Sequence, residues 1–318
     1  MCDSSGRTRP RALFDGARVA LVAAGGPVDD AQIERSQDRC RHLGLEPVLL
    51  PHARSLRGYL AGPDDDRLSD LQAAVDDPSI DGVWALRGGY GTMRIIDRLS
   101  LDRQLRDPIP FIGFSDNTTI LVEHASLRVV SFHGPHPGGD FPQETEASFR
   151  EVLYSEEPAG KIEGLGGDPK PRTLVGGAAS GHLWGGNLST LAALCGSSSR
   201  LNGRGRILFL EDVGEPAYRV DRMLAQLVRA GITQGVRGLA FGRFSGISLG
   251  EAEAVVETLT EFAQGLGVPS TTDLPFGHTK HNCTLPVDAL VRLDSDAGTL
   301  TILEGAVERS RGRVLPSK

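Results

Sequence analysis

The chain up to about residue 135 alternates short apolar runs with longer amphipathic ones, and this alternation restricts the fold more than any other feature. The apolar runs predict strands and include ARVALVAAGG, LEPVLL, DGVWALRGG, PFIGF and RVVSFHG. The runs between them predict helices and include DDAQIERSQDRCRHLG, DRLSDLQAAVDD, TMRIIDRL and NTTILVEHAS. Short apolar strands between amphipathic helices are typical of an α/β fold, a parallel sheet with helices on both faces. Such sheets bind ligands outside the carboxyl ends of their strands, so the residues there are candidates for function.

The second half of the chain is less regular. Residues 135–172 are rich in glycine, proline and polar side chains, which favours a linker or surface loops. Beyond them, predicted strands and helices are mixed, and ALVRLDSDAGTLTILE alternates apolar and polar residues around a turn, as an antiparallel hairpin does. We therefore predict one domain over residues 1–140, a linker over 141–172 and a β-rich mixed domain over 173–318.

Composition excludes several classes of protein. The net charge of −7 gives no bulk attraction to nucleic acid or to an anionic membrane. No apolar stretch is long enough to span a bilayer, and the first residues lack the apolar core of a secretory signal, so we expect a soluble, cytoplasmic protein. The cysteines are far apart and form no CxxC pair, which favours free thiols over a zinc or redox site: Cys2, Cys40, Cys195 and Cys283.

Ser115 stands in FIGFSDNTTI, where a predicted strand gives way to a predicted helix. A sharp turn of this kind can display a nucleophilic serine, and it can equally hold an ordinary helix cap. A serine nucleophile needs a base to accept its proton, and the base needs a carboxylate to orient it.

Two residues of the second half could supply that base and carboxylate. His278 follows DLPFG and opens the irregular loop HTKHN, where it could reach across a domain junction or simply bond to backbone. Glu211 comes at the end of the apolar strand RILFL, where an imidazolium could hold it ionised. The plainer alternative, a helix cap, fits Asp212 and Glu215 better than Glu211.

Residues 87–91, RGGYG, place a glycine pair at a predicted strand end. Backbone N–H groups there, and the N–H of Asp116 beside the serine, could form an oxyanion hole, although such a pair is more often only a turn. The spacing lacks GxGxxG, which excludes dinucleotide binding of that type. His133 and His136 suggest a metal, but Pro135 and Pro137 break any helix between them, so we expect no metal or other cofactor.

Several separated motifs together resemble the LD-carboxypeptidases, serine peptidases that include muramoyltetrapeptide carboxypeptidases and microcin C immunity peptidases. The motifs are LRGGYG, GFSDNT, GGNLSTL, LEDVGEPAYRVDRML and GHTKHNCTLP, and the resemblance covers nearly the whole chain. It implies a flavodoxin-like N-terminal domain with a parallel sheet, a smaller β-rich mixed C-terminal domain and a homodimer. It also implies a catalytic triad of Ser115, Glu211 and His278, with oxyanion donors at Gly89 and Asp116.

The expected activity is hydrolysis of an LD-peptide bond, which releases a C-terminal D-amino acid from murein-type peptides during peptidoglycan recycling. The alternative is detoxification of peptidyl- or aminoacyl-nucleotides, as in microcin C immunity. We expect Gly88, Tyr90 and Glu215 to bind the small peptide substrate. A carboxylate at Glu215 favours a substrate with a free amine over one with a phosphate, and immunity-type relatives tend to carry a lysine at this place.

Overall fold

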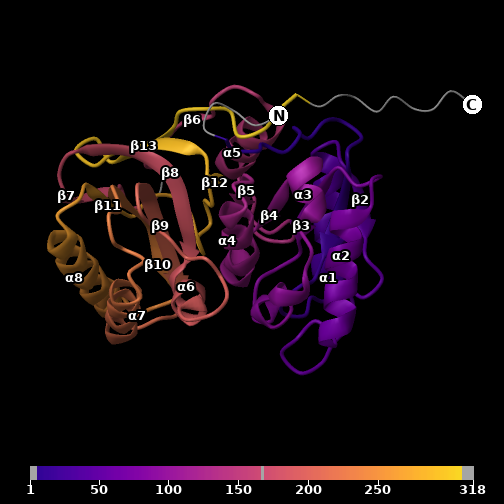
Figure 1. Ribbon diagram of the computed structural model, residues 1–318, viewed down its shortest axis with the longest axis horizontal. Coiled ribbons are helices and arrows are strands. Elements are labelled where there is room, and N and C mark those ends of the chain that lie inside the picture. The colour runs from indigo at the N-terminus through magenta and orange to yellow at the C-terminus, as the bar shows by residue number, and fades with distance from the viewer. Residues whose placement is uncertain (1–5, 166–167, 310–318) are drawn as a thin grey trace, which may run out of the picture.

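The computed structural model describes residues 6–165 and 168–309. Two sheets lie side by side, one built mainly from the first half of the chain and the other from the second half (Figure 1). Among the described residues, no helix is both long and apolar enough to cross a membrane.

The first sheet has the order β12-β5-β4-β3-β1-β2. Its strands are β1 (Arg18–Val22), β2 (Glu46–Leu49), β3 (Gly82–Ala85), β4 (Phe111–Gly113), β5 (Ser131–His133) and β12 (Leu285–Val287). β1 to β5 are parallel, and their order 2-1-3-4-5 is that of flavodoxin-like sheets. The helices that accompany them are α1 (Asp30–His42), α2 (Asp64–Asp76), α3 (Asp102–Arg106) and α4 (Thr118–Ser126). The predicted parallel α/β architecture is therefore confirmed.

The second sheet has the order β6-β14-β13-β8-β9-β10-β11-β7. Its strands are β6 (Gly160–Ile162), β7 (Arg172–Val175), β8 (Ala178–Asn187), β9 (Arg206–Val213), β10 (Gly238–Ser245), β11 (Ser270–Thr272), β13 (Leu290–Asp294) and β14 (Thr299–Ile302). Its helices are α6 (Leu188–Leu194), α7 (Ala217–Arg229) and α8 (Leu249–Leu266). β8 to β11 are parallel and the flanking strands antiparallel, with β13 and β14 forming the expected hairpin. The predicted β-rich, mixed character is confirmed.

The segment predicted as a linker is more ordered than its composition indicates. Helix α5 (Gln143–Tyr154) and strand β6 both fall within residues 141–172. Phe149 of α5 is fully buried and stacks on Trp84 of β3, with ring centroids 4.7 Å apart. The expectation of surface loops was wrong for α5, because its apolar face completes the core beside the first sheet.

The two sheets do not divide the chain at one point. β12 comes late in the sequence, yet it pairs antiparallel with β5 and so closes the edge of the first sheet. The domain limits drawn from the sequence stay a prediction.

One predicted helix is wrong. TMRIIDRL forms two short 3₁₀ turns, η1 (Thr92–Arg94) and η2 (Ile96–Arg98), and no α-helix. The backbone N–H and the hydroxyl of Thr92 both bond to Asp116, which fixes the start of this segment to a different part of the fold. Such tertiary hydrogen bonds override a local preference for helix.

The described cysteines, Cys40, Cys195 and Cys283, are free, as expected, and Cys2 lies outside the described residues. Cys40 and Cys283 are buried, and burial raises the pKa of each thiol to about 12. Neither is therefore ionised at neutral pH.

Candidate active site

Ser115 lies where β4 ends, as the first residue of the 3₁₀ turn η3 (Ser115–Asn117) that leads into α4. Its φ of 62° is in the left-handed region, which residues other than glycine rarely adopt. The side chain of Asn117 stabilises this conformation, because its Nδ2 donates to the carbonyls of Phe114 and Arg87, both at 3.1 Å. A strained serine at a strand-to-helix turn is the geometry of a nucleophile elbow.

Three of the predicted residues come together beside this elbow. Nε2 of His278 lies 3.1 Å from Oγ of Ser115, and Nδ1 of His278 lies 2.7 Å from Oε2 of Glu211. A carboxylate can only accept, so Nδ1 carries the proton and Nε2 is free to accept from the serine hydroxyl. The structure thus brings the three side chains into one hydrogen-bonded chain.

Glu211 is fully buried near the end of β9 and is held from several sides. Nδ2 of Asn187 donates to its Oε1 at 3.3 Å, and the backbone N–H of His278 donates to its Oε2, also at 3.3 Å. Gly277 has a φ of 101°, and a Cβ atom there would lie 2.7 Å from Oε2 of Glu211. Glycine at 277 therefore makes room for the carboxylate against the loop that carries His278.

The pKa values around this carboxylate follow from burial and pairing. Burial raises the pKa of Glu211, but the hydrogen bond and positive charge of His278 lower it by more than burial raises it. The pKa of Glu211 therefore lies below its usual value. For His278, burial lowers the pKa, and the bond to Glu211 more than reverses this. Next to them, burial and the charge of Glu211 raise the pKa of Asp212 to about 6.

Asp212 has a different structural role from Glu211. Its carboxylate accepts from the backbone N–H groups of Ser189 and Val213, both at 2.8 Å. Nδ2 of Asn187 donates to it at 3.0 Å. Asp212 therefore anchors the first turn of α6, which precedes it in the chain. The alternative that it caps the following helix is wrong, because the N-cap of α7 is Pro216 and no side chain caps that helix.

The turn RGGYG packs directly against the elbow. A Cβ atom on Gly88 would lie 2.6 Å from Cβ of Ser115, so a larger residue could not approach the serine as closely. Gly89 has a φ of 87°, and the N–H of Gly26 donates to the carbonyl of Gly88 at 2.7 Å. Gly88 therefore lies against the serine with no side chain between them, while Gly89 packs against Gly26.

Asp116 joins this turn to the elbow. Its carboxylate accepts from the backbone N–H of Thr92 at 2.9 Å and from that of Gly91, and its own carbonyl accepts from the hydroxyl of Thr92 at 2.7 Å. Asp116 is 5% exposed, and burial raises the pKa of its carboxyl group. The two predicted oxyanion donors, Gly89 and Asp116, thus belong to loops that are tied together by the Asp116 side chain.

The residues predicted to bind substrate occupy different settings. Gly88 lies against the serine, as described. Tyr90 is 45% exposed and its ring centroid is 5.8 Å from that of Tyr59. Glu215, just before α7, forms an ion pair with Arg219 at 3.5 Å. Contact of these residues with a substrate stays a prediction.

His133 and His136 lie around Phe114, the residue before the serine. The ring centroid of Phe114 is 4.2 Å from that of His136, 4.8 Å from that of His278 and 5.5 Å from that of His133. Burial lowers the pKa of His133 to about 4 and that of His136 to about 3, so both are neutral at physiological pH. In the described part of the chain, no three His, Cys, Asp or Glu side chains are grouped as a metal would require.

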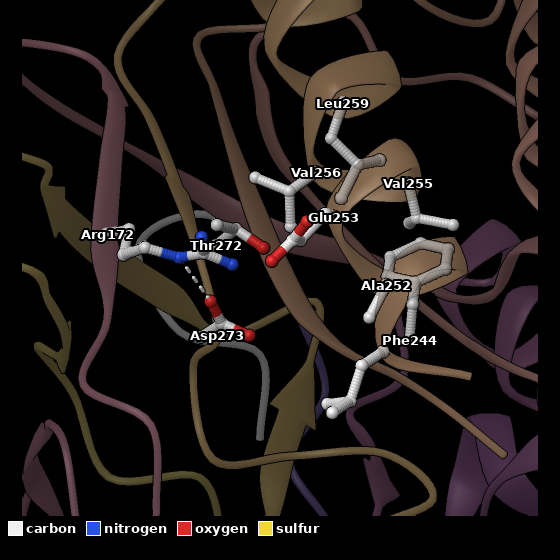
Figure 2. A pocket seen from close by; sticks show the side chains of 10 residues that line it. Arg172, Phe244, Ala252, Glu253, Val255, Val256, Leu259, Thr272 and Asp273 are labelled. Carbon is white, nitrogen blue, oxygen red and sulfur yellow. Dashed lines mark hydrogen bonds and ion pairs between the residues drawn. The ribbon is translucent and has the colours of Figure 1, made fainter. Parts of the chain in front are cut away.

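A pocket of about 310 Å³ opens beside His278. Its walls come from the residue after β4, from the loop after β5 and from the loop that carries His278: Phe114, Pro135, His136, Gly139, Asp140, Gly277, His278, Thr279, Lys280 and Asn282. A smaller pocket of about 140 Å³ lies against α8 and contains none of the three hydrogen-bonded residues. Figure 2 shows this second pocket, where Arg172 pairs with Asp273 at 2.8 Å opposite apolar side chains of α8. The pocket beside His278 is therefore the candidate binding site.

Sequence reasoning missed the roles of Asn187 and Phe114. Asn187 ends β8, bonds to both Glu211 and Asp212, and caps α6 by accepting from the N–H of Thr190. The motif GGNLSTL contains Asn187, but a bond to residues 24 and 25 positions later leaves no local pattern. Phe114 looked like one more apolar strand residue.

Residues 19–134 match the LD-carboxypeptidase N-terminal domain family, and residues 180–293 match the corresponding C-terminal domain family. A Streptomyces coelicolor homologue is 41% identical over 303 residues, which cover 92% of this chain and 96% of that protein. The murein tetrapeptide carboxypeptidase of Pseudomonas aeruginosa is 32% identical over 284 residues, 85% of this chain and 90% of that one.

Solved structures agree with the fold. The muramoyltetrapeptide carboxypeptidase of Oxalobacter formigenes superimposes with a TM-score of 0.77 at 32% identity, covering 90% of this chain and 97% of that one. The microcin C7 self-immunity protein MccF gives a TM-score of 0.85 over 95% of this chain and 100% of its own, at 21% identity. The second likeness supports the fold alone.

Proposed function

Since this chain belongs to the LD-carboxypeptidase family, and is thereby a serine carboxypeptidase, we propose that it hydrolyses an LD-peptide bond in murein-type peptides and releases the C-terminal D-amino acid. The observation that carries this proposal is the chain of hydrogen bonds from Ser115 through His278 to Glu211, at 3.1 and 2.7 Å. Such a chain is the arrangement that activates a serine for acyl transfer.

In the proposed acylation step, Oγ of Ser115 attacks the carbonyl carbon of the scissile peptide bond while Nε2 of His278 takes its proton. Glu211 stabilises the imidazolium that forms and keeps the ring oriented. The negative charge on the carbonyl oxygen is stabilised by the backbone N–H groups of Gly89 and Asp116, near the N-terminal end of α4.

Collapse of the tetrahedral intermediate breaks the C–N bond, and the proton on His278 passes to the leaving amine. The D-amino acid departs and the acyl group stays on Ser115. A water molecule then gives its proton to His278 and attacks the ester, which regenerates the serine. Because His133 and His136 are buried and neutral, they place no second positive charge beside the imidazolium of His278 in either step.

Murein tetrapeptide is the substrate class we favour. The support is the 32% identity to a murein tetrapeptide carboxypeptidase, together with the carboxylate of Glu215, which suits a substrate with a free side-chain amine. Arg219 at 3.5 Å neutralises part of that charge, so the identity carries more weight than Glu215. Peptidyl- or aminoacyl-nucleotides are the competing substrates.

The test offers the purified protein a murein tetrapeptide and, separately, an aminoacyl-sulfamoyl adenylate, with release of the amino acid followed by mass spectrometry. We expect release of the terminal D-amino acid from the tetrapeptide, absent in Ser115→Ala. Faster cleavage of the adenylate would move the protein to the competing activity. Prolonged treatment with a strong chelator should leave the rate unchanged, and loss of activity that zinc restores would contradict a serine mechanism without metal.

Two further expectations belong to this proposal. We expect a homodimer, which sedimentation of the purified protein will test. We also expect Glu215→Lys to raise KM for a tetrapeptide with a free side-chain amine and to improve hydrolysis of a phosphate-bearing nucleotide. Equal responses of the two substrates would remove Glu215 from the binding site.

A further inference from the structure

A cavity rich in arginine lies beside the first sheet, away from the residues described so far. Its volume is about 350 Å³. It is lined by Arg9, Arg11, Arg106, Asp107, Pro108, Glu308 and Arg309. The lining thus carries four guanidinium groups and two carboxylates, in a chain whose net charge is −7. Like charges around one space repel one another, so this basic cavity is a place where an anion is favoured.

Three segments that are far apart in the sequence build the basic cavity. The N–H of Arg11 donates to the carbonyl of Pro108 at 3.3 Å, and the N–H of Ala12 donates to the carbonyl of Glu308 at 2.7 Å. The N–H of Glu308 in turn donates to the carbonyl of Pro10 at 2.8 Å. Because backbone hydrogen bonds join the segments, the meeting of their arginines is a property of the fold and not of flexible side chains alone.

The basic cavity and Ser115 lie at opposite ends of β4. Pro108 comes shortly before the first residue of this strand, Phe111, and Ser115 follows shortly after its last residue, Gly113. A molecule in the basic cavity is therefore not the peptide that Ser115 attacks. The inference goes beyond the proposed function and does not depend on it.

Two of the four guanidinium groups pair with carboxylates. A terminal nitrogen of Arg9 lies 3.1 Å from Glu304, and one of Arg11 lies 3.1 Å from Asp107. Each pair engages one terminal nitrogen of a group that has five N–H donors. Arg103 also reaches Asp107, at 3.5 Å, so two cations share this carboxylate. The carboxylate of Asp107 is therefore occupied and opposes an incoming anion only weakly.

Arg106 and Arg309 have no such partner. Both are exposed, and across residues 6–165 and 168–309 no carboxylate forms an ion pair with either of them. A guanidinium is planar and can donate to two oxygens of one anion at the same time. Two unpaired guanidinium groups on one cavity, beside two further arginines, suit a ligand with several oxygens and more than one negative charge.

We propose that the basic cavity binds a phosphate group, either as the free ion or as a monoester of a small molecule. A phosphate monoester offers three acceptor oxygens and a charge close to −2, which matches the two unpaired guanidinium groups. The volume is in the range of pockets for small molecules. The negative charge of the whole chain disfavours a long polyanion such as nucleic acid.

The experiment titrates the full chain with inorganic phosphate and, separately, with glycerol 3-phosphate, by calorimetry at fixed ionic strength. We expect dissociation constants of about 0.1–10 mM, the range that two charged hydrogen bonds give. Arg106→Gln and Arg309→Gln should each weaken binding by about 10-fold or more, and the double variant should abolish it. Arg106→Lys, which keeps the charge without the planar fork, should recover part of the affinity.

Arg200→Gln is the matched control. Arg200 is exposed, forms no ion pair within the described part of the chain and lies outside the basic cavity. The substitution changes the net charge by the same amount as Arg106→Gln, so it should leave phosphate binding unchanged. Thermal unfolding without phosphate will show that each variant is folded.

The outcomes separate the sources of the phosphate and the ways in which the inference fails. Binding of glycerol 3-phosphate alone would identify a monoester as the ligand, and equal binding of both would identify the phosphate group itself. Equal weakening by Arg106→Gln and Arg200→Gln would show that only net charge matters and would overturn the inference, as would heats no larger than those of sodium chloride. Much tighter binding of a single-stranded oligonucleotide, with a steep salt dependence, would show a surface for polyanions and would also overturn it.

Discussion

The two halves of the candidate active site are positioned by different means. On the first sheet, Ser115 is held by backbone geometry: a φ of 62°, the bare glycine of Gly88 against its Cβ, and loops joined through backbone N–H groups. On the second sheet, His278 and Glu211 are held by side-chain hydrogen bonds and opposite charge. The first half is therefore vulnerable to added atoms, and the second to changes of charge and pH.

The contrast extends to the buried carboxylates of the two halves. Asp116 and Glu211 are both buried, yet burial raises the pKa of Asp116 while the pKa of Glu211 lies below its usual value. Asp116 accepts only from neutral donors, and the charge of Arg67 lowers its pKa less than burial raises it. Glu211 has His278 as a partner that becomes a cation. The difference separates a structural carboxylate from one that responds to proton transfer.

The largest expected effect comes from two substitutions that each remove the reacting group from one half of the site. Ser115→Ala and His278→Ala should each lower kcat by about 10³-fold or more, because members of a triad act as a unit. The double variant should lose little beyond either single one. Steady-state rates on the tetrapeptide, with circular dichroism as a check on folding, will test this. Multiplying losses in the double variant would show that the two halves act independently.

The next effect separates charge from shape in the second half. Glu211→Gln keeps the size of the side chain but removes the charge that raises the pKa of His278. We expect kcat/KM to fall by about 10²- to 10⁴-fold, as it does when the orienting carboxylate of a triad becomes an amide.

The pH profile of the same variant shows in which direction Glu211 shifts the pKa of His278. The base must be neutral, so wild-type activity should fall as the pH drops through a midpoint above 6.5, the ordinary value for histidine. In Glu211→Gln the midpoint should move to lower pH. Glu215→Gln, which removes a carboxylate paired with Arg219, should leave the midpoint in place. An unmoved midpoint in Glu211→Gln would contradict the pairing.

The sequence predicted some parts of this site far better than others. Ser115, Glu211 and His278 each follow a strand-like run or a glycine, and their motifs resemble one family, so all three could be named in advance. The expectation of surface loops failed at α5, because composition does not report a single apolar face such as that of Phe149. The expected helix after RGGYG failed because Thr92 bonds to Asp116, 24 residues away.

The third-largest expected effect on activity comes from adding a methyl group to one glycine in each half of the site. Gly88→Ala would place a Cβ 2.6 Å from that of Ser115, and Gly277→Ala would place one 2.7 Å from Oε2 of Glu211 at a φ of 101°. We expect activity losses of about 10-fold or more in both, and Gly277→Ala should also destabilise the fold by about 1–3 kcal/mol.

Gly250 provides the control for both glycines. It lies in α8 with no atom within 4 Å of an added Cβ, so Gly250→Ala should keep full activity and unchanged or slightly higher stability. Chemical denaturation and tetrapeptide turnover will measure both quantities. If Gly88→Ala is as active as Gly250→Ala, the close approach of the turn to Ser115 has no part in catalysis.

The smallest expected effect tests the comparison between the two carboxylates directly. Asp116→Asn keeps an oxygen that can accept from the N–H of Thr92, and it removes a charge that burial disfavours. The folded-state pKa of Asp116 is raised, so its ionised form costs stability at neutral pH, and this cost is relieved as the pH falls toward that pKa. Asp116→Asn should therefore be as stable as the wild type or slightly more stable at pH 7, with the difference vanishing in acid. Activity should change by only a few-fold, in contrast to the loss in Glu211→Gln. Melting temperatures from pH 4 to pH 8 and tetrapeptide rates provide the measurement. A loss of activity as large as that of Glu211→Gln would mean that the charge of Asp116 takes part in the reaction, as the charge of Glu211 does, and would contradict the distinction between the two carboxylates.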